Sequence, residues 1–427
     1  MSGDIHVAII GAGRHGRDLI NWCMDIPGVR FQAACDIWSY AQKYAAGLLK
    51  KRGHAAAVYE DYRDMLAKEK GLDAAIIATP DSFHADQAIA CLESGLHVYC
   101  EKEMHTTIDG ARRMVKASRD RKKLLQIGRQ HRSNPRYTLA RQYIYEKKAL
   151  GRITSVFGQW HGHKRVPYTW PAAYAIDAAT LKRYGFASME EHRNWRWLEK
   201  FSAGEIANLG SHQIDVFNWF LGSPPKAVMA TGGLDYYNIF ELYDNAECLF
   251  AWDFAWEGKT RTVRGTYNVQ TTTDDGGFHE VFTGDQGSMG TSEDTTKGGI
   301  FREEEASPAE CERDLTSLGI RYSGYYASPT GYMAWALFRY GMRPPPLPPN
   351  VYVSGRQLRI YEFPSIAGDD KPPHWHHLKN FFDAARGQGK LNCPGEVGFQ
   401  ACVSALKAIE AMKAGRRLEL KPDDFAI

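Results

Sequence analysis

The stretch 6-HVAIIGAGRHG-16 joins an unbroken apolar run to a glycine-rich turn. Such a run predicts a strand buried on both faces. The glycines follow the spacing G-x-G-x-x-G at Gly11, Gly13 and Gly16. The first glycine permits a tight turn, the second lets the backbone approach a pyrophosphate, and the third permits close packing of helix on strand. The stretch therefore predicts a dinucleotide-binding βαβ unit.

A carboxylate follows the glycine turn at the distance that such a unit requires. Asp36 lies 20 residues beyond Gly16, at the end of the second predicted strand, where it can accept both ribose hydroxyls. The phosphates would lie on N–H groups of the helix that begins at Arg14 and His15. Asp36 would repel a 2′-phosphate, and the two residues after it supply no cation to hold one. We therefore expect NAD as cofactor rather than NADP.

Strand and helix patterns alternate along the first 130 residues. Further apolar runs occur at 31–35, 74–78, 98–100 and 124–127, and helical patterns at 14–25, 38–52, 82–94 and 107–121. This alternation is typical of a doubly wound parallel sheet, so the predicted class is α/β. We expect residues 1–130 to form a Rossmann domain that binds NAD.

The remaining residues, 131–427, have a different pattern. A helix near 134–148 precedes strand-like segments at 153–161, 226–232 and 247–256, and helices are predicted at 374–386 and 395–414. Residues 257–300 are rich in Gly, Thr and Asp, which indicates hairpins and exposed loops within a loop-rich region over 257–345. The prolines of 343–349 indicate a stiff spacer. We expect a second α/β domain that binds substrate.

Composition excludes several classes of protein. The 53 basic and 50 acidic residues leave a net charge of +3, without a basic stripe, so no nucleic-acid partner is expected. No apolar run reaches the roughly 20 residues of a membrane span, and no signal peptide is recognisable. The eight scattered cysteines include no CxxC pair, which favours free thiols in the cytoplasm.

Polar residues follow the later strands of the first domain, at the sheet edge where ligands bind. Thr79 and Pro80 follow one strand, and His84 either touches the cofactor or caps the next helix. Glu101-Lys102-Glu103 follows the next strand, with the lysine either salt-bridged or placed to handle a proton. After the last strand, residues 128–132 would face the cleft between domains, and Gln130 and His131 are candidates to border nicotinamide or substrate.

His212 is a candidate general base. It lies in the segment 208–215, Asn-Leu-Gly-Ser-His-Gln-Ile-Asp, at the start of a helical pattern. Imidazole is suited to take a proton near neutral pH, and a nearby ammonium would stabilise a developing alkoxide. From the residues alone, a buried structural histidine is an equal alternative.

Together these motifs resemble the Gfo/Idh/MocA family of sugar and polyol oxidoreductases. The resemblance rests on the glycine fingerprint, Glu101-Lys102, the segment 209–215, Leu150-Gly151-Arg152, Gly232-Gly233 and the closing segment from His377 to Gly398. It covers essentially the whole chain. It implies a Rossmann domain followed by an α/β domain with a large open, mainly antiparallel sheet, which often mediates homo-oligomer contacts, here a dimer or tetramer.

The resemblance also implies roles for individual residues. Glu101 and Lys102 would lie beside the nicotinamide, and a substrate-side couple would map to Asn208 and His212. Two departures matter: the family's usual proline is Glu103, and its usual aspartate is Asn208, which cannot accept a proton. Proton transfer would then rest on His212 with Lys102 as its partner, and Asn208 would contact the substrate.

Further substrate contacts are expected from two segments. The candidates are Trp160, His161, His163, Arg165, Trp195 and Arg196. A His-x-His on a strand places both imidazoles on one face, which suits a metal, but no third ligand has a telling spacing, so we expect no metal. The histidines of 374–377 begin a helix on a polar segment and are interpreted as solvated or interfacial.

We expect NAD-linked oxidation of a ring hydroxyl of a sugar, glycoside or polyol, with C3 of a pyranose as the candidate position. A second hypothesis is a glycosidase with tightly held NAD, which oxidises, eliminates the aglycone, hydrates and re-reduces. A third is a sugar or nucleotide sensor without catalysis, which the departures at Asn208 and Glu103 favour.

Overall fold

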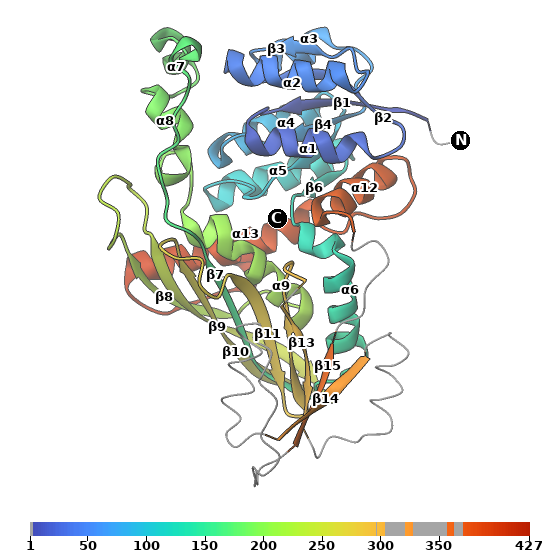
Figure 1. The fold of residues 1–427 in the computed structure, drawn as a ribbon, viewed down its shortest axis with the longest axis vertical. Helices are drawn as coiled ribbons and strands as arrows, with labels where there is room; N and C mark the ends of the chain where they lie inside the picture. The colour runs from blue at the N-terminus through green and yellow to red at the C-terminus, as the bar shows by residue number, and fades with distance from the viewer. Residues whose placement is uncertain (1–2, 296, 304–320, 328–356, 363–369) are drawn as a thin grey trace.

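The computed structural model describes residues 3–295, 297–303, 321–327, 357–362 and 370–427, so the prolines of 343–349 lie outside the described residues. Two sheets, one above the other in Figure 1, divide the molecule. The first has the order β3-β2-β1-β4-β5-β6, and all its strands run parallel. The predicted doubly wound sheet is confirmed.

The elements of the first sheet follow the predicted alternation closely. The strands are β1 Ile5–Ile10, β2 Val29–Cys35, β3 Ala57–Tyr59, β4 Ala74–Ile77, β5 His97–Cys100 and β6 Leu125–Ile127. The helices are α1 Arg14–Met24, α2 Ser39–Lys51, α3 Tyr62–Lys68, α4 His84–Glu93 and α5 Ile108–Arg121. Of these elements, β3 and α3 were not predicted. The strand β3 is a three-residue edge strand without a buried side chain, so it leaves no alternating pattern in the sequence.

The glycine turn shows why two of its glycines are required by the fold. A Cβ on Gly16 would lie 2.0 Å from the backbone oxygen of Gly11. Gly11 has φ +91°, and a Cβ there would lie 2.5 Å from the oxygen of Ala78. A Cβ on Gly13 would meet nothing within 4 Å. The space beside Gly13 is therefore free for a ligand, as the fingerprint requires.

The second sheet has ten strands among the described residues, in the order β14-β15-β13-β12-β11-β7-β10-β9-β8-β16. Only β7 and β10 pair in parallel among these strands; the other pairs are antiparallel. The strands are β7 Ile153–His161, β8 Ala227–Gly233, β9 Asn245–Trp256, β10 Lys259–Gln270, β11 Phe278–Gly284, β12 Gly287–Thr291, β13 Gly299–Arg302, β14 Arg321–Ala327, β15 Gln357–Glu362 and β16 Leu418–Glu419. The predicted open, mainly antiparallel sheet is confirmed.

The prediction of exposed loops over 257–300 is wrong for most of that range. Residues 259–270 and 278–284 form long strands, and Val263, Tyr267, Val269 and Phe282 are buried. The Gly and Thr content suggested loops, but alternating apolar and β-branched residues satisfy a half-buried strand. A hairpin does join β11 to β12, as predicted.

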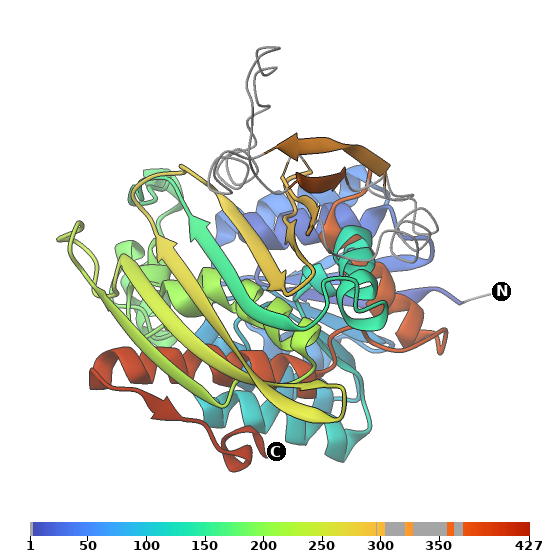
Figure 2. The same cartoon turned by 90° about the horizontal axis from the view of Figure 1, so that it is seen from below.

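Helices cover one face of this second sheet. They include α6 Pro135–Arg141, the π-helical turn η3 Gln142–Glu146, α9 Ser211–Leu221 and α13 Gly395–Ala414. In the view from below in Figure 2 the strands lie in front of α9 and α13. The outer face exposes apolar side chains, with Met229 46% and Leu249 55% exposed.

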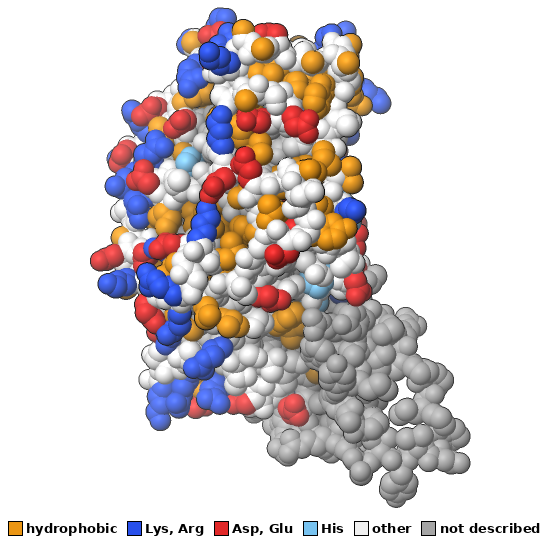
Figure 3. Space-filling model, turned by 90° about the vertical axis from the view of Figure 1, so that its left-hand side faces the viewer, with side chains coloured by type: hydrophobic (Ala, Val, Ile, Leu, Met, Phe, Trp, Pro, Cys, Tyr) orange, Lys and Arg blue, Asp and Glu red, His pale blue; other side chains and the backbone are white. Residues whose placement is uncertain are grey.

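The two parts of the chain interlock. Helix α12 (Pro373–Ala385) packs on α1 and β5, and its Leu378, Phe381 and Phe382 belong to the core under the first sheet. Helix α13 packs on both α5 and α9. Helices α7 (Ala178–Arg183) and α8 (Met189–Arg193) rise beside the first domain in Figure 1, on the side where Figure 3 shows acidic and basic side chains interspersed. The substrate-side segments are thereby held against the Rossmann edge.

Candidate active site

The carboxyl edge of the first sheet offers a built place for a dinucleotide. Gly13 is the N-cap of α1 and has no side chain, so the first N–H groups of the helix, from Arg14 to Gly16, have no side-chain acceptor among the described residues. The Asp36 carboxylate accepts from the Ala12 N–H and the Trp38 N–H, both at 2.8 Å. Burial raises the pKa of Asp36. The residues present therefore fit NAD, with free amides for the phosphates and a fixed carboxylate at the ribose position.

A cation that the sequence did not indicate also lies near this position. The Arg193 guanidinium is 4.7 Å from the ring of Trp38, and the Trp38 Nε1 donates to the backbone oxygen of Tyr174 at 2.6 Å. Both partners come from segments more than 100 residues away, so the neighbours of Asp36 in sequence did not predict them. The segment from Tyr174 to Arg193 therefore lies beside Trp38 and close to Asp36.

The loops after β4 and β5 are tied together by a histidine. Thr79 donates from its hydroxyl to Gln87 at 2.6 Å, and Pro80 precedes the short helix η1 (Asp81–Phe83). His84 is fully buried, with its ring nitrogens 2.6 Å from the oxygen of Glu103 and 2.8 Å from that of Thr79. No ring nitrogen is left for a cofactor or for capping α4, so His84 positions the two loops instead.

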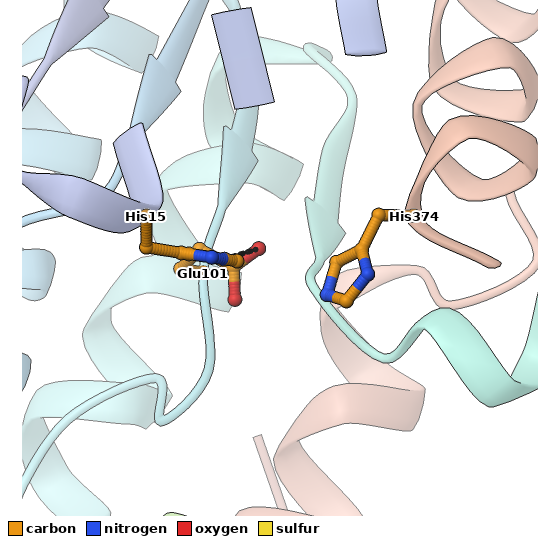
Figure 4. A group of neighbouring side chains, drawn as sticks. All are labelled: His15, Glu101 and His374. Atoms are coloured by element: carbon orange, nitrogen blue, oxygen red, sulfur yellow. Dashed lines mark ion pairs between the residues drawn. The ribbon is translucent and has the colours of Figure 1, made fainter. Parts of the chain in front are cut away.

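Three side chains from distant segments meet beside the start of α1 (Figure 4). His15 lies 3.2 Å from the Glu101 carboxylate, and the ring of His374 lies 5.5 Å from that of His15 and stacks on Trp22. Burial alone would raise the pKa of Glu101, but the two imidazoles and Lys102 hold it at about 2. The donor atoms of this group lie within 4.8 Å of one another, so it could hold a metal as well as border a cofactor.

Of the two interpretations of residues 374–377, solvated or interfacial, the solvated one is wrong for His377, while the packing of α12 on α1 and β5 fits the interfacial one. His377 is fully buried, where it contacts the oxygen of Ile127 at 2.8 Å and the hydroxyl of Ser133 at 2.6 Å. His374 is half-buried, with its ring next to that of His15 at the start of α1. The polar composition misled the prediction because α12 turns these imidazoles toward polar groups of the first domain.

Lys102 and Asn208 meet across the two domains. The Lys102 ammonium donates to the backbone oxygen of Asn208 and to its Oδ1, the latter at 3.0 Å. Asn208 lies in the π-helical turn η6 (Ile206–Gly210), directly before α9. Burial lowers the pKa of Lys102 by more than the negative charges of Asp81 and Glu103 raise it, so the pKa is lowered overall. The charge of Glu103 is itself paired, since Arg129 donates to it at 2.8 and 3.0 Å.

His212 lies at the start of α9 in a mostly aromatic environment. Its ring stacks on Trp160 at 5.7 Å and meets the edge of His131 at 5.1 Å. It is 5% exposed, and its Nδ1 has no hydrogen-bond partner among the described residues. Burial, and then the charge of Lys102, lower the pKa of His212 well below its usual value. A neutral imidazole beside an ammonium is the combination that alcohol oxidation needs.

The pKa of His131 is shifted in the direction opposite to that of His212. His131 is 1% exposed, stacks on Tyr137 at 4.4 Å, and pairs with Glu293 at 2.9 Å. Burial lowers the pKa of His131, but Glu293 and Glu280 more than offset this, so it is raised. Sequence reasoning missed both carboxylates because they fall in the range interpreted as loops. Two neighbouring histidines thus have their pKa values moved in opposite directions.

The remaining predicted contacts are scattered. His161 has both ring nitrogens bonded, to Asp275 and Asn268. His163 follows the end of β7 and is largely exposed, so the expectation that both imidazoles share one face of a strand is wrong. Gln130 is buried next to His131. Arg165 pairs with Glu205 at 3.3 Å, whereas the Arg196 guanidinium lies 4.3 Å from the ring of Trp195 and acts electrostatically on Asp81 and Lys102.

The first sheet carries a glycine turn with a fixed carboxylate, and a lysine and a neutral histidine lie between the two sheets. This arrangement is that of two-domain NAD-binding oxidoreductases. Residues 5–129 match the oxidoreductase family with an NAD-binding Rossmann fold, and residues 138–289 match the GFO/IDH/MocA C-terminal domain. These matches cover more than half of the chain. The chain belongs to the Gfo/Idh/MocA family, as the sequence motifs predicted.

Named relatives indicate the range of this family. Inositol 2-dehydrogenase of Rubrobacter xylanophilus is 30% identical over 188 residues, which are 42% of this chain and 51% of that protein. Levoglucosan dehydrogenase of Pseudarthrobacter phenanthrenivorans is 28% identical over 161 residues, 36% of this chain and 35% of that protein. The chain thus spans about half the length, or less, of these curated relatives.

Solved structures show the same fold along nearly the whole chain. The WlbA dehydrogenase from Bordetella pertussis, in complex with NADH and UDP-GlcNAcA, superposes with a TM-score of 0.68 at 20% identity and covers 99% of both chains. A levoglucosan dehydrogenase in complex with NADH and L-sorbose gives a TM-score of 0.68 at 18% identity, covering 98% and 99%. At these identities the likeness is one of fold.

Proposed function

We propose that this protein is an NAD-dependent dehydrogenase that oxidises a ring hydroxyl of a sugar, glycoside or polyol. The observation that carries the proposal is the buried ring of His212, which lies against His131 and Trp160 and is close enough to Lys102, just after β5, for the lysine's charge to lower its pKa. The family membership and the dehydrogenase names of the relatives support it. We keep C3 of a pyranose as the candidate position.

The reaction divides between the two residues. His212 takes the proton of the substrate hydroxyl, because its lowered pKa keeps the ring neutral. Its Nδ1 is available for this, since it has no hydrogen-bond partner among the described residues. Lys102 stabilises the negative charge that develops on the hydroxyl oxygen. Bound NAD would supply the acceptor for the hydride that leaves the same carbon. Trp160 stacks on the His212 ring and thereby limits its orientation.

Substrate binding is assigned to groups that converge near His212. The rings of His131 and Trp160 contact that of His212, Gln130 directly precedes His131, and Asn208 borders Lys102. The thiols of the seven described cysteines are all free, which supports our placement of the protein in a reducing cytoplasm. No described helix is long and apolar enough to cross a membrane.

The open face of the second sheet supports the proposal of a homo-oligomer. Met229 and Leu249 are about half exposed on neighbouring strands β8 and β9. Exposed apolar side chains on an uncovered sheet face are suited to contact a second copy of the chain. Sedimentation at micromolar concentration would test this, and a sedimentation coefficient of a monomer would contradict it.

The test of the activity is absorbance at the NADH band while the purified protein meets NAD and a panel of free sugars, polyols and aryl glycosides, with myo-inositol and levoglucosan included. Growth of the band with one sugar supports a dehydrogenase. A flat trace with released aglycone supports the glycosidase, because transient oxidation followed by re-reduction leaves no net NADH. NAD binding without turnover of any compound supports the sensor.

A further inference from the structure

Lys102 and Asn208, which meet between the two domains, form a couple that contains no carboxylate. Asn208 faces Lys102, and an amide carries no charge to balance an ammonium. The nearest carboxylate to Asn208 belongs to Glu205, three residues earlier. Its Oε2 accepts from the Asn208 Nδ2 at 3.1 Å. A carboxylate therefore does reach this couple, but through the amide.

The position of Glu205 is built by its neighbours. The residue is 6% exposed, and its other oxygen accepts from the Arg165 guanidinium at 3.3 Å. Gly204 precedes it with φ +87°, and a Cβ there would lie 2.6 Å from the ring of Tyr243. The turn that begins the π-helical segment is thus available only to glycine, and it fixes where the Glu205 side chain starts.

An asparagine amide has one accepting and one donating end, which makes its orientation decisive. If the Asn208 amide turned over, its NH₂ group would face the Lys102 ammonium, and two donors would oppose each other. Glu205 prevents this because an ionised carboxylate only accepts, so it holds the Nδ2 end. The Oδ1 end is then left for Lys102.

We propose that Glu205 is a positioning residue that orients the Asn208 amide toward Lys102 and supplies, through it, the negative charge that an aspartate at 208 would carry. The inference deepens the proposed dehydrogenase function and rests on it. Variants that move the negative charge from residue 205 to residue 208 test this proposal. Glu205→Gln removes the charge, Asn208→Asp places a second carboxylate beside the first, and the double variant leaves one carboxylate, at 208.

The activity measurement is the pH profile of kcat and KM for these three variants and the wild type, with a sugar from the panel. Each single variant should lower kcat at pH 7 about 10-fold with little change in KM, and the double variant should return to within about 3-fold of the wild type. Glu199→Gln is the matched control, since Glu199 pairs with Lys413 on the surface, and it should change nothing. Additive losses in the double variant would overturn the proposal.

A second readout does not depend on turnover. In Asn208→Asp the new carboxylate lies beside Lys102, which favours its ionisation, and beside Glu205, which opposes it. In the double variant residue 205 carries no charge, so the pKa of Asp at 208 is lower there, and Asn208→Asp loses stability relative to the double variant as pH rises and the carboxylates ionise. The difference in melting temperature between the double variant and Asn208→Asp should therefore be larger at pH 8 than at pH 5. An identical pH dependence of the melting temperature in Asn208→Asp and in the double variant would overturn the proposed contact between residues 205 and 208. If melting shows the coupling while the wild type oxidises no sugar, the proposed function fails and the positioning stands.

Discussion

The cofactor side and the substrate side of this site are built in different ways. The part of the cofactor side that would face the phosphates and the ribose consists of backbone amides, glycines and one carboxylate within residues 11–36, held by contacts such as Asp36 to Ala12, and tertiary packing adds Arg193 and His374 at its border. The substrate side consists of buried and half-buried side chains from distant segments, among them Lys102, His131 and His212. A site formed by a local turn can be predicted from one stretch of sequence, whereas a site formed by tertiary packing exists only once the chain has folded.

The first prediction, with a large expected effect, separates the two sides by chemistry. Lys102→Met removes the ammonium that stabilises the developing alkoxide but leaves the glycine turn untouched, so kcat should fall about 100- to 1,000-fold. Stopped-flow measurement of NADH formation gives kcat, and calorimetric titration gives the affinity for NAD. The Kd for NAD should change by less than about 3-fold. A loss confined to NAD affinity would remove Lys102 from the chemistry.

The next prediction separates fold from ligand within the glycine turn. Gly16→Ala places a Cβ 2.0 Å from a backbone oxygen, so it should lower the melting temperature by several degrees and weaken NAD binding. Gly13→Ala meets nothing within 4 Å, so it should leave the melting temperature unchanged and weaken NAD binding about 100-fold by obstructing the pyrophosphate. Equal melting temperatures for both variants would contradict this distinction.

The carboxylate at the ribose should have a smaller effect. Asp36→Ser removes the charge that repels a 2′-phosphate, and Arg193 then becomes a cation within reach of that group. We expect the preference for NAD over NADP, measured as the ratio of kcat/KM values, to fall about 10-fold. Adding Arg193→Gln should restore part of the preference. An unchanged ratio in Asp36→Ser would place cofactor selection elsewhere.

The sequence predicted the parallel sheet and the cofactor residues because both depend on local patterns. Gly11, Gly13, Gly16 and Asp36 follow from the spacing alone, and the structure keeps them at one sheet edge. Lys102 and His212 required the family resemblance, since a buried structural histidine was an equal reading. Glu205 had a signal that went unused: it lies three residues before Asn208, on the same face of a helical turn.

Other site residues had no local signal. His374 reaches the cofactor edge only because α12 returns to pack on α1. Glu280 and Glu293 reach His131 only because residues 278–291 form strands of the second sheet instead of loops. His84 had a signal, but it was ambiguous, and its two backbone contacts show a positioning role. Tertiary pairing decides such cases.

The smallest effect concerns the pH profile. His212 acts as a base only when neutral, and its pKa is well below 6.5, so kcat/KM should stay high as pH falls through 6.5. His131→Gln removes a nearby positive charge while keeping a donor for Glu293, so the pKa of His212 should rise. The acid limb should then move to higher pH by about one unit. A shift to lower pH would contradict the opposed pKa values of the two histidines.

The measurement that tests the central claim most directly is turnover and NAD affinity on the same preparation of His212→Ala. Loss of the base should lower kcat about 1,000-fold, while the Kd for NAD stays within about 2-fold of wild type, because the cofactor side does not depend on this side chain. Turnover close to that of the wild type would contradict the account and remove His212 from the reaction.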